Sequence, residues 1–482
     1  MTSAPAGPGP HVDPTRDDPG IAALSEGVGG PVGRRAGRHP WWTPVRVLLA
    51  LVALVMALGM VQKAPCVEDG WNDADVRATY MCYSDLPYLY TGRGFVEAAW
   101  PYDDDAEVRD RYEVMEYPVG ISYFAYAAAR VTHVLTGNAD VSDRAEQPTD
   151  GFWGEEQVQR EITVFLALSA LAFALAAMLA VWFLAGVNRR RPWDAALFAV
   201  SPALLVTGLV NWDLLAVVLV AAALWAWARD RPVLTGVLIG VGVATKLYPL
   251  FLLGAILVIC LCDRRMLDFV KATAAAAVAW LLANLPAYLS GPEEWRVFWS
   301  FNSERGPDLG SAWLVAAQWS DRAIEPETIN LWSWLLFGAW CVGVFVLGVL
   351  APETPRFAQL GFLIVAGFLL VNKVYSPQYV LWLLPLAVLA RPRLRDQAVW
   401  QLSELFYFAA VWWYLAGWLA PGGGDEPGFY WLAIVLRIAG ELFLVALVVR
   451  DVLRPQHDPV RASALAAPAA PPPVPPVGAG VS

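Results

Sequence analysis

Residues 211–250, NWDLLAVVLVAAALWAWARDRPVLTGVLIGVGVATKLYPL, decide the class of this protein. Two apolar runs, 213–228 and 232–248, are joined by a short turn that carries Arg229 and Arg231. Runs of this length and hydrophobicity predict membrane-spanning helices near the short end of the spanning range. The basic turn predicts the cytoplasmic side, so the polar ends NWD and TKLYP are expected on the opposite side.

The composition extends this pattern to the whole chain. Of its 482 residues, 57% are hydrophobic and only 16% are charged, which is too little polar surface for a soluble protein of this length. The 24 Trp and 16 Tyr fit the aromatic belts at membrane interfaces. No basic patch of the kind that binds nucleic acids is present in the sequence. Further apolar runs occur at 44–62, 161–187, 195–210, 249–262, 267–290, 329–350, 357–372, 378–390, 399–419 and 428–449.

The basic residues predict how these runs are oriented. Arginines follow alternate runs, and placing all of them in the cytoplasm gives twelve crossings with both tails inside. They are Arg34, Arg35, Arg38, Arg189, Arg190, Arg191, Arg229, Arg231, Arg264, Arg265, Arg391, Arg393, Arg395, Arg450 and Arg454. Residues 119–136 are also apolar, but a crossing there would turn every later arginine cluster outward. We therefore expect a helix on the outer face, with a thirteen-span topology as the alternative.

The predicted fold is an all-α polytopic membrane protein with one membrane domain, residues 44–450. Its first extracytoplasmic loop, 63–160, is large and is expected to carry surface helices. Residues 1–43 and 451–482 are rich in Gly, Pro and Ala, which predicts disordered cytoplasmic tails. In the loop, Cys66 and Cys82 are candidates for a disulfide.

The polar motifs that interrupt the apolar pattern all fall on the predicted outer side. These motifs are the 63–117 loop, EYP at 116–118, NWD at 211–213, TKLYP at 245–249, SERG at 303–306 and NKVYSPQY at 372–379. Scattered structural polar residues have no reason to share one face, so the shared face predicts a site.

Asp85, in YSDLPYLY, is the candidate catalytic carboxylate. A carboxylate among aromatic residues near the bilayer surface is partly desolvated, which raises its pKa toward a value suited to accepting a proton. The structural alternative is a solvated loop acid or a helix cap. Asp73 and Asp75, in WNDAD, are the competing carboxylates.

The candidate substrate-binding residues each have a structural alternative. Glu116 and Tyr117 also fit a helix start. NWD at 211–213 fits a tight turn that caps the following span, and the alternative is that Asp213 orients a cation such as Lys246. A lysine in an apolar run either snorkels to the interface or binds an anion such as phosphate. The full set of candidates is Tyr88, Glu116, Tyr117, Asp213, Lys246, Tyr248, Glu304, Arg305, Lys373, Gln378 and Tyr379.

Several classes of site are missing from the sequence. There is no Walker loop and no HExxH motif, and the four histidines do not cluster. Neither a metal nor another cofactor is expected. The inner loops are too short for a nucleotide-sugar domain, so any donor is expected to come from the membrane.

Residues 211–250 resemble the signature block of glycosyltransferase family 87, in the GT-C superfamily. YSDLPYLYTGRG at 83–94, EYPV at 116–119, SERGPDLGSAW at 303–313 and NKVYSPQYVLWLLP at 372–385 resemble its other blocks. The resemblance covers about 44–450 and implies a GT-C-like bundle.

The resemblance further implies transfer of a sugar, mannose by analogy, from a polyprenyl-phosphate donor to a cell-envelope glycolipid or glycan. The reaction would take place on the extracytoplasmic face of the plasma membrane. Asp85 matches the loop aspartate that acts as base, although the superfamily often has a paired-acid signature in this loop. The alternatives from other classes are a transporter or flippase for a lipid-linked or acidic solute, and a non-catalytic envelope scaffold.

Overall fold

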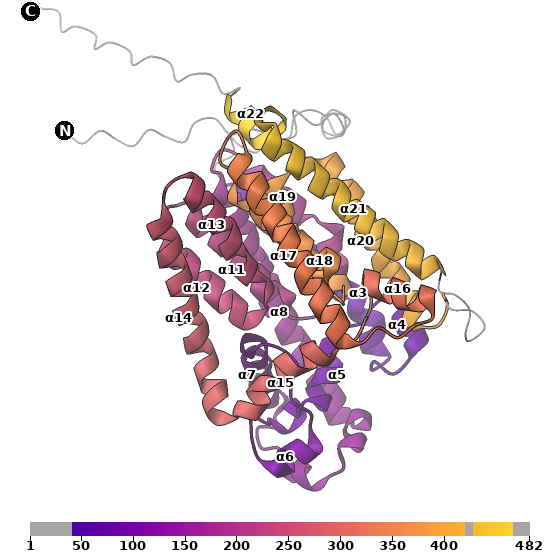
Figure 1. The fold of residues 1–482 in the computed structure, drawn as a ribbon. Coiled ribbons are helices and arrows are strands. Elements are labelled where there is room, and N and C mark those ends of the chain that lie inside the picture. The colour runs from indigo at the N-terminus through magenta and orange to yellow at the C-terminus, as the bar shows by residue number, and fades with distance from the viewer. Residues whose placement is uncertain (1–40, 420–427, 466–482) are drawn as a thin grey trace, which may run out of the picture.

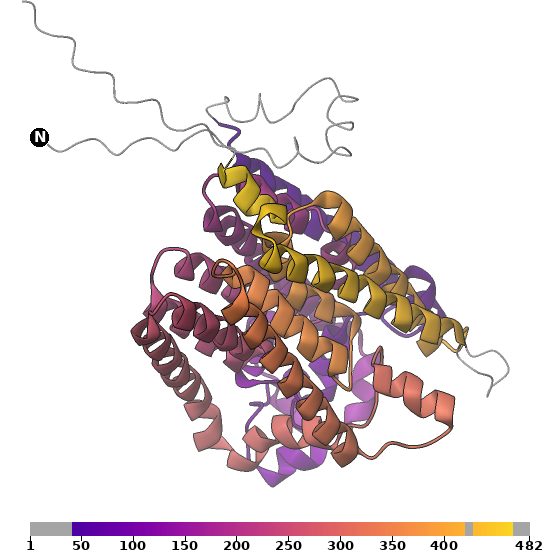
Figure 2. The same cartoon turned by 45° about the horizontal axis from the view of Figure 1, so that its top comes forward.

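The structure is a computed structural model that describes residues 41–419 and 428–465, and these residues are helical with no strand. Within the described residues, eleven helices form the bundle: α3 (Pro44–Glu68), α8 (Glu156–Val187), α11 (Asp213–Trp227), α12 (Pro232–Thr245), α13 (Leu252–Cys262), α14 (Met266–Ser290), α17 (Pro326–Leu350), α18 (Phe357–Val371), α19 (Val380–Ala390), α20 (Leu394–Leu415) and α21 (Gly428–Leu453). They run roughly side by side (Figure 1), and Figure 2 shows α20 and α21 along one flank.

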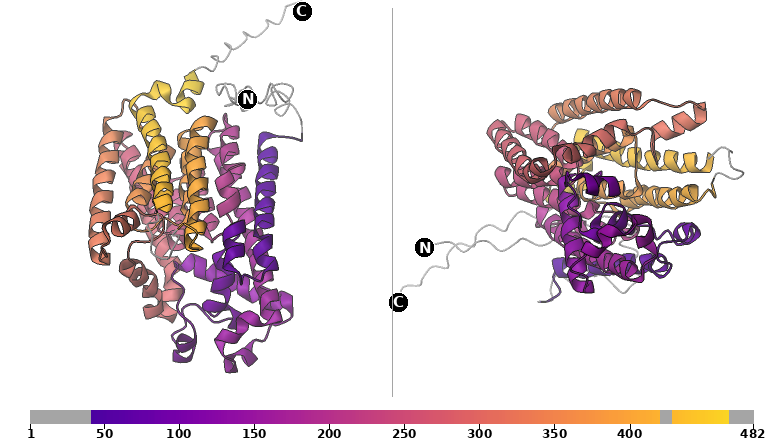
Figure 3. Two further views of the ribbon diagram at one scale, coloured as in Figure 1. Left: turned by 90° about the vertical axis from the view of Figure 1, so that its right-hand side faces the viewer. Right: turned by 90° about the horizontal axis from the view of Figure 1, so that it is seen from below.

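The described residues contain nine further α-helices, most of them short. They are α4 (Ala74–Tyr80), α5 (Asp85–Gly92), α6 (Ala106–Arg111), α7 (Val119–Thr136), α9 (Ala196–Ala199), α10 (Pro202–Thr207), α15 (Pro292–Glu304), α16 (Ala312–Ser320) and α22 (Pro459–Leu465). The 3-10 turns are η2 (Phe95–Glu97), η3 (Ser142–Glu146), η4 (Thr149–Gly154), η5 (Pro192–Ala195), η6 (Tyr248–Phe251), η7 (Pro377–Tyr379) and η8 (Pro455–His457). In Figure 3, left, α22 lies at the upper end and the first-loop helices at the lower end.

Five described helices are long and apolar enough to cross a membrane: α3, α8, α14, α17 and α21. Only 11% of the apolar window of α14 and 17% of that of α17 are buried inside the protein, so these two helices expose a large apolar surface. The shorter apolar helices coincide with most of the other predicted runs. A helical membrane protein is therefore supported, while the count of twelve crossings stays a prediction.

The run at 195–210 is not one helix, because it breaks at Ser201 and Pro202. Proline has no backbone N–H to continue a helix, and it fits the first position of a new one. The Ser201 hydroxyl accepts the Leu204 N–H at 3.2 Å and caps α10. The predicted span is therefore a pair of short helices, α9 and α10.

Small residues bring α12 and α14 together. A Cβ atom added at Gly236 would lie 2.1 Å from the Ala272 carbonyl oxygen, and one at Gly240 would lie 2.2 Å from that of Ala276. Such spacing of small residues lets two membrane helices approach until their backbones touch. This contact fixes the helix whose end carries Lys246.

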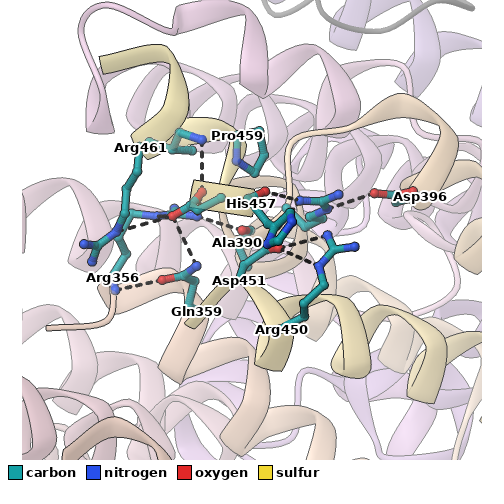
Figure 4. A network of polar contacts seen from close by, with 12 residues as sticks. Arg356, Gln359, Ala390, Asp396, Arg450, Asp451, His457, Pro459 and Arg461 are labelled. Carbon is teal, nitrogen blue, oxygen red and sulfur yellow. Dashed lines mark hydrogen bonds and ion pairs between the residues drawn. The ribbon is translucent and has the colours of Figure 1, made fainter. Parts of the chain in front are cut away.

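The arginine-rich end of the bundle is closed by ion pairs. Figure 4 shows Arg356 and Arg461 around the start of α22, with Asp396 and Asp451 nearby. Asp458 bonds Arg356 at 2.8 Å and 3.0 Å, and Arg391 bonds Asp396 and Asp451 at 2.8 Å and 2.7 Å. Arg191, which follows α8, bonds Ser463 at 2.7 Å. The arginine clusters after α8, α17 and α19 therefore meet at one end.

These contacts correct the expected boundary of the C-terminal tail. Residues 451–465 were expected to be disordered, but they complete α21 and form η8 and α22. Composition alone does not show that Asp458 is buried and pairs with Arg356, the N-cap residue of α18. The predictions for residues 1–40 and 466–482 lie outside the described residues.

The α7 helix begins and ends at the same end of the bundle, opposite α22. Near its start, Gly120 lies against Thr245 at the end of α12. Near its end, His133 lies 2.8 Å from the Tyr90 hydroxyl, which also donates to Glu161 at 2.9 Å near the start of α8. Both ends of α7 thus lie at one end of the bundle, and its place on the outer face stays a prediction.

Two further links hold the first loop in place. Cys66, near the end of α3, forms a disulfide with Cys82 between α4 and α5. Arg144 bonds Glu161 of α8 through two contacts of 2.8 Å and 3.0 Å. Both links keep α5 at the mouth of the bundle.

Candidate functional site

One cavity of about 820 Å³ lies at the end of the bundle opposite α22. All six polar motifs contribute to its lining, although they are far apart in the sequence. Nine of the twelve predicted site residues line it: Asp85, Tyr88, Glu116, Tyr117, Lys246, Arg305, Lys373, Gln378 and Tyr379. The cavity volume lies in the range that binds small molecules.

Asp85 is held in place by the turn ahead of α11. Its backbone N–H donates to the Val210 carbonyl at 2.8 Å, and the hydroxyl of the preceding Ser84 donates to the same oxygen at 3.3 Å. Ser84 also caps α5, since its hydroxyl accepts the Leu86 N–H. A conventional capping serine thus leaves the next side chain, a carboxylate, facing the cavity.

Asn211, Tyr117 and Tyr83 all form side-chain hydrogen bonds with the Asp85 carboxylate. The amide of Asn211 reaches Oδ2 at 2.6 Å, and the Tyr117 hydroxyl lies 3.4 Å from the same atom. Burial raises the pKa of Asp85 to about 6, although hydrogen bonds from Tyr83 and Asn211 and the charge of Lys246 act to lower it. A carboxyl group with this pKa is ionised near neutral pH and is basic enough to take a proton.

Sequence reasoning missed the role of Asn211. It interpreted NWD as a turn that caps α11, whereas the Asn211 amide bridges Asp85 and the Tyr117 hydroxyl, the latter at 2.7 Å. A buried amide beside an apolar run was the available signal, but its partners are 126 and 94 residues away.

Lys246 lies at the end of α12 with its ammonium group in the cavity lining. The ammonium is 3.3 Å from Asp213 Oδ1 and 4.8 Å from the centre of the Tyr117 ring. Asp213 is fully buried and accepts the Trp382 indole N–H at 2.6 Å. A buried lysine with a carboxylate partner is thus held at the cavity rather than snorkelling to the interface.

Three predicted contacts differ from the structure. Asp213 and Tyr248 are fully buried and do not line the cavity, because Trp382 bonds one and stacks on the other at 4.7 Å. Glu304, at the end of α15, is exposed and also lies off the cavity lining. Direct substrate contact by these three residues is therefore not supported.

Two further cations line the cavity from the segments that follow α15 and α18. Arg305 is paired with Asp308 at 2.8 Å, and Lys373 donates to Asn330 at 2.6 Å. Burial lowers the pKa of Lys373, and the charge of Arg305 lowers it further. A phosphate between these groups would relieve their repulsion.

Aromatic rings complete the lining. Tyr379 stacks on Trp382 at 4.0 Å, and Tyr88 stacks on Trp153 at 5.3 Å and accepts a hydrogen bond from Arg77. Arg77 was not among the predicted residues, although it also lines the cavity. Gln378 lies in the lining between these groups.

Glu116 also lines the cavity, but it is paired with Arg93 at 3.0 Å. The competing acids of WNDAD lie elsewhere: Asp73 caps α4 by accepting the Asp75 N–H at 2.8 Å, and neither lines the cavity. Of the acids weighed as the base, Asp85 is the one in the cavity. Among the described residues, no cluster of three or more His, Cys, Asp or Glu side chains is arranged to hold a metal ion.

A comparison with models of protein families matched one stretch of the chain. Residues 158–372 match the model of glycosyltransferase family 87. The resemblance found in the sequence is thereby confirmed over the stretch that contains NWD, TKLYP and SERG, while Asp85 lies outside the matched range. No curated protein matched the chain.

Proposed function

On the premise that the match to glycosyltransferase family 87 indicates a membrane glycosyltransferase, we propose that this protein transfers a sugar from a polyprenyl-phosphate donor to a glycolipid or glycan acceptor. Mannose is the proposed sugar and the plasma membrane the proposed location. One observation carries the proposal: a single cavity brings the Asp85 carboxylate together with the cationic side chains of Lys246, Arg305 and Lys373.

The proposed reaction is one displacement at the anomeric carbon. Asp85 takes the proton of an acceptor hydroxyl, whose oxygen forms the new bond to C1 while the bond from C1 to the phosphate oxygen breaks. Polyprenyl phosphate leaves with the bonding electron pair, and the configuration at C1 inverts. Phosphate is a stable anion, so it needs nearby cations rather than a proton from a general acid.

The cavity has residues for each part of this reaction. Lys246, Arg305 and Lys373 carry the positive charges that a phosphate group requires. Phe298, Trp334 and other apolar residues of α15 and α17 line the same space, and α17 exposes much of its apolar surface. This combination supports a donor with a charged head and a lipid tail.

The placement of charge supports an extracytoplasmic site. The arginine-rich end is sealed by the ion pairs around Asp458 and Arg391, and the cavity lies at the other end. By the positive-inside rule the arginine-rich end is cytoplasmic. The polar motifs gather at this one end, which favours an enzyme over a transporter, because a transporter needs polar features that reach both faces.

The experiment compares Asp85→Asn with Asp75→Asn in membranes supplied with polyprenyl-phosphate mannose. Loss of a positioned base lowers the rate about 100-fold to 10,000-fold, so Asp85→Asn is expected to lose transfer while remaining folded. Asp75 lies in the same loop, outside the cavity, and its variant should keep the wild-type rate. Full turnover by Asp85→Asn would refute the role of Asp85. Flipping of a lipid-linked substrate by wild type without transfer would support the transporter instead.

A further inference from the structure

Two loops that are joined to each other carry two of the cations that line the cavity. Residues 305–311 contain Arg305, and residues 372–376 contain Lys373. The Asp308 N–H donates to the Lys373 carbonyl at 2.9 Å. The Tyr375 N–H donates to the Leu309 carbonyl at 2.7 Å. We call these two segments the loop pair. Because these hydrogen bonds hold the two segments together, the position of Arg305 relative to Lys373 depends on the backbone of the loop pair.

The loop pair is attached from behind to α20 and α21. The Gly310 N–H donates to the Tyr430 hydroxyl at 3.1 Å, and the Gly310 carbonyl accepts from Arg437 at 3.0 Å. The Tyr407 hydroxyl donates to the Tyr375 carbonyl at 2.6 Å. Gly310 has φ +69° and no room for a side chain, since an added Cβ would lie 2.1 Å from the Tyr407 hydroxyl. Both backbone groups of this glycine are therefore used for anchoring.

Arg437 is the centre of this attachment. It is fully buried, pairs with Glu441 at 2.8 Å, and lies 3.8 Å from the centre of the Tyr375 ring. The Tyr375 hydroxyl in turn donates to buried Glu404 at 2.9 Å. Arg437, Glu404 and Glu441 do not line the cavity, so they do not contact a substrate there.

A buried ion pair is weak evidence for stability by itself, because desolvation offsets much of the attraction. Here one arm of the guanidinium contacts a carboxylate and another contacts the loop backbone. Only arginine supplies several N–H donors in a rigid, planar fork. Arg437 thus connects α21 to the backbone of the loop pair, which carries Arg305 and Lys373.

We propose that Arg437 is a positioning residue for phosphate recognition: it fixes the loop pair so that Arg305 and Lys373 together face the phosphate of the donor lipid. This inference rests on the proposed function, since that function supplies the phosphate. Arg437 acts through the loop pair and makes no contact with the donor.

The test measures binding of two probes to purified full-length protein in detergent: a polyprenyl monophosphate and the corresponding polyprenol. Arg437→Lys keeps the charge but cannot hold Glu441 and the Gly310 carbonyl in the same geometry. We expect its affinity for the monophosphate to fall about tenfold to hundredfold, as for a lost hydrogen bond to a charged group. Its affinity for the polyprenol should stay unchanged, because the apolar lining is intact.

Arg391→Lys is the matched control. Arg391 is also buried and also pairs with carboxylates, Asp396 of α20 and Asp451 of α21, but it lies at the opposite end of these helices and does not bond the loop pair. Its variant should have a lower melting temperature and an unaltered preference for the phosphorylated lipid. A general loss of packing would instead affect the two variants alike.

Tyr430→Phe serves as a second variant if Arg437→Lys does not fold, because it removes the hydroxyl that accepts the Gly310 N–H and that also bonds Tyr407, the other anchor of the loop pair. It should also reduce the preference for the monophosphate. Folded variants that keep the full wild-type preference would overturn the positioning role. Wild-type protein that does not distinguish the monophosphate from the polyprenol would instead overturn the proposed function, so the two failures are distinguishable.

Discussion

Replacing Asn211 with alanine should move the pH dependence of transfer upward. The Asn211 amide donates to Asp85 Oδ2 at 2.6 Å and is one of the groups that lower the pKa of this carboxyl from the value that burial alone would produce. A hydrogen bond to a charged group contributes about 1.5–3 kcal/mol. Since about 1.36 kcal/mol corresponds to one pKa unit, its loss would raise the pKa by about one to two units.

Water that enters the space left by the amide replaces part of this bond, so we expect the lower end of that range. The pKa of Asp85 would then rise from about 6 to roughly 7. A general base works only when ionised, so the variant loses activity at a higher pH than wild type. At pH 6 the ionised fraction falls from about one half to about one tenth, whereas near pH 8.5 both proteins are almost fully ionised.

The assay is the initial rate of sugar transfer from pH 5 to pH 9 under subsaturating donor, which reports the free enzyme. Asn302→Ala is the control, because Asn302 also lines the cavity but bonds the Phe298 carbonyl instead of Asp85. Its acidic limb should coincide with that of wild type. An Asn211→Ala enzyme that is folded and active, with its acidic limb still near pH 6, would refute the assignment of Asp85 as base.

Three further predictions concern Lys246, the Cys66–Cys82 disulfide and the ion pairs of Asp458 at the arginine-rich end. Lys246→Met should raise the KM for the donor, because it removes a cation from the cavity. It should also lower the melting temperature, because Asp213 loses its partner in a buried pair and breaking such a pair costs about 3–5 kcal/mol. Adding Asp213→Asn should restore the melting temperature but not the KM. Replacing Cys66 and Cys82 with serine should cost about 3 kcal/mol of stability, as expected for a closed loop of this size, and thermal unfolding in detergent with and without reductant checks it. Asp458→Asn weakens the ion pairs at the inner end, so it should lower the melting temperature and leave the rate of transfer unchanged; a large loss of activity would contradict a purely structural role.

Some features followed from the sequence because they depend on local composition. Apolar runs marked most of the long helices, and the positions of the arginines placed Arg191 and Arg391 at one common end. The number of predicted crossings between the polar motifs also placed Asp85 and Lys373 on one face, and both residues line the cavity. Each of these predicted features depends on the free energy of transferring side chains into the bilayer, and this free energy can be assessed for every segment separately.

Other features depend on which segments pack together, and pattern reasoning did not find them. Asn211 meets Asp85 across 126 residues, and Arg437 reaches Gly310 across 127. Residues 455–465 form η8 and α22 because Asp458 finds arginine partners, although their composition indicated a tail.

Taken alone, the sequence determined that the chain forms a helical membrane bundle and which residues gather at one end. Only the tertiary structure decided which of these residues line the cavity and which hold them from behind, as Trp382 holds Asp213 away from it. The physical reason is that hydrophobicity sets depth in the membrane for each helix separately, whereas hydrogen-bond partners depend on the rotation and contacts of several helices at once.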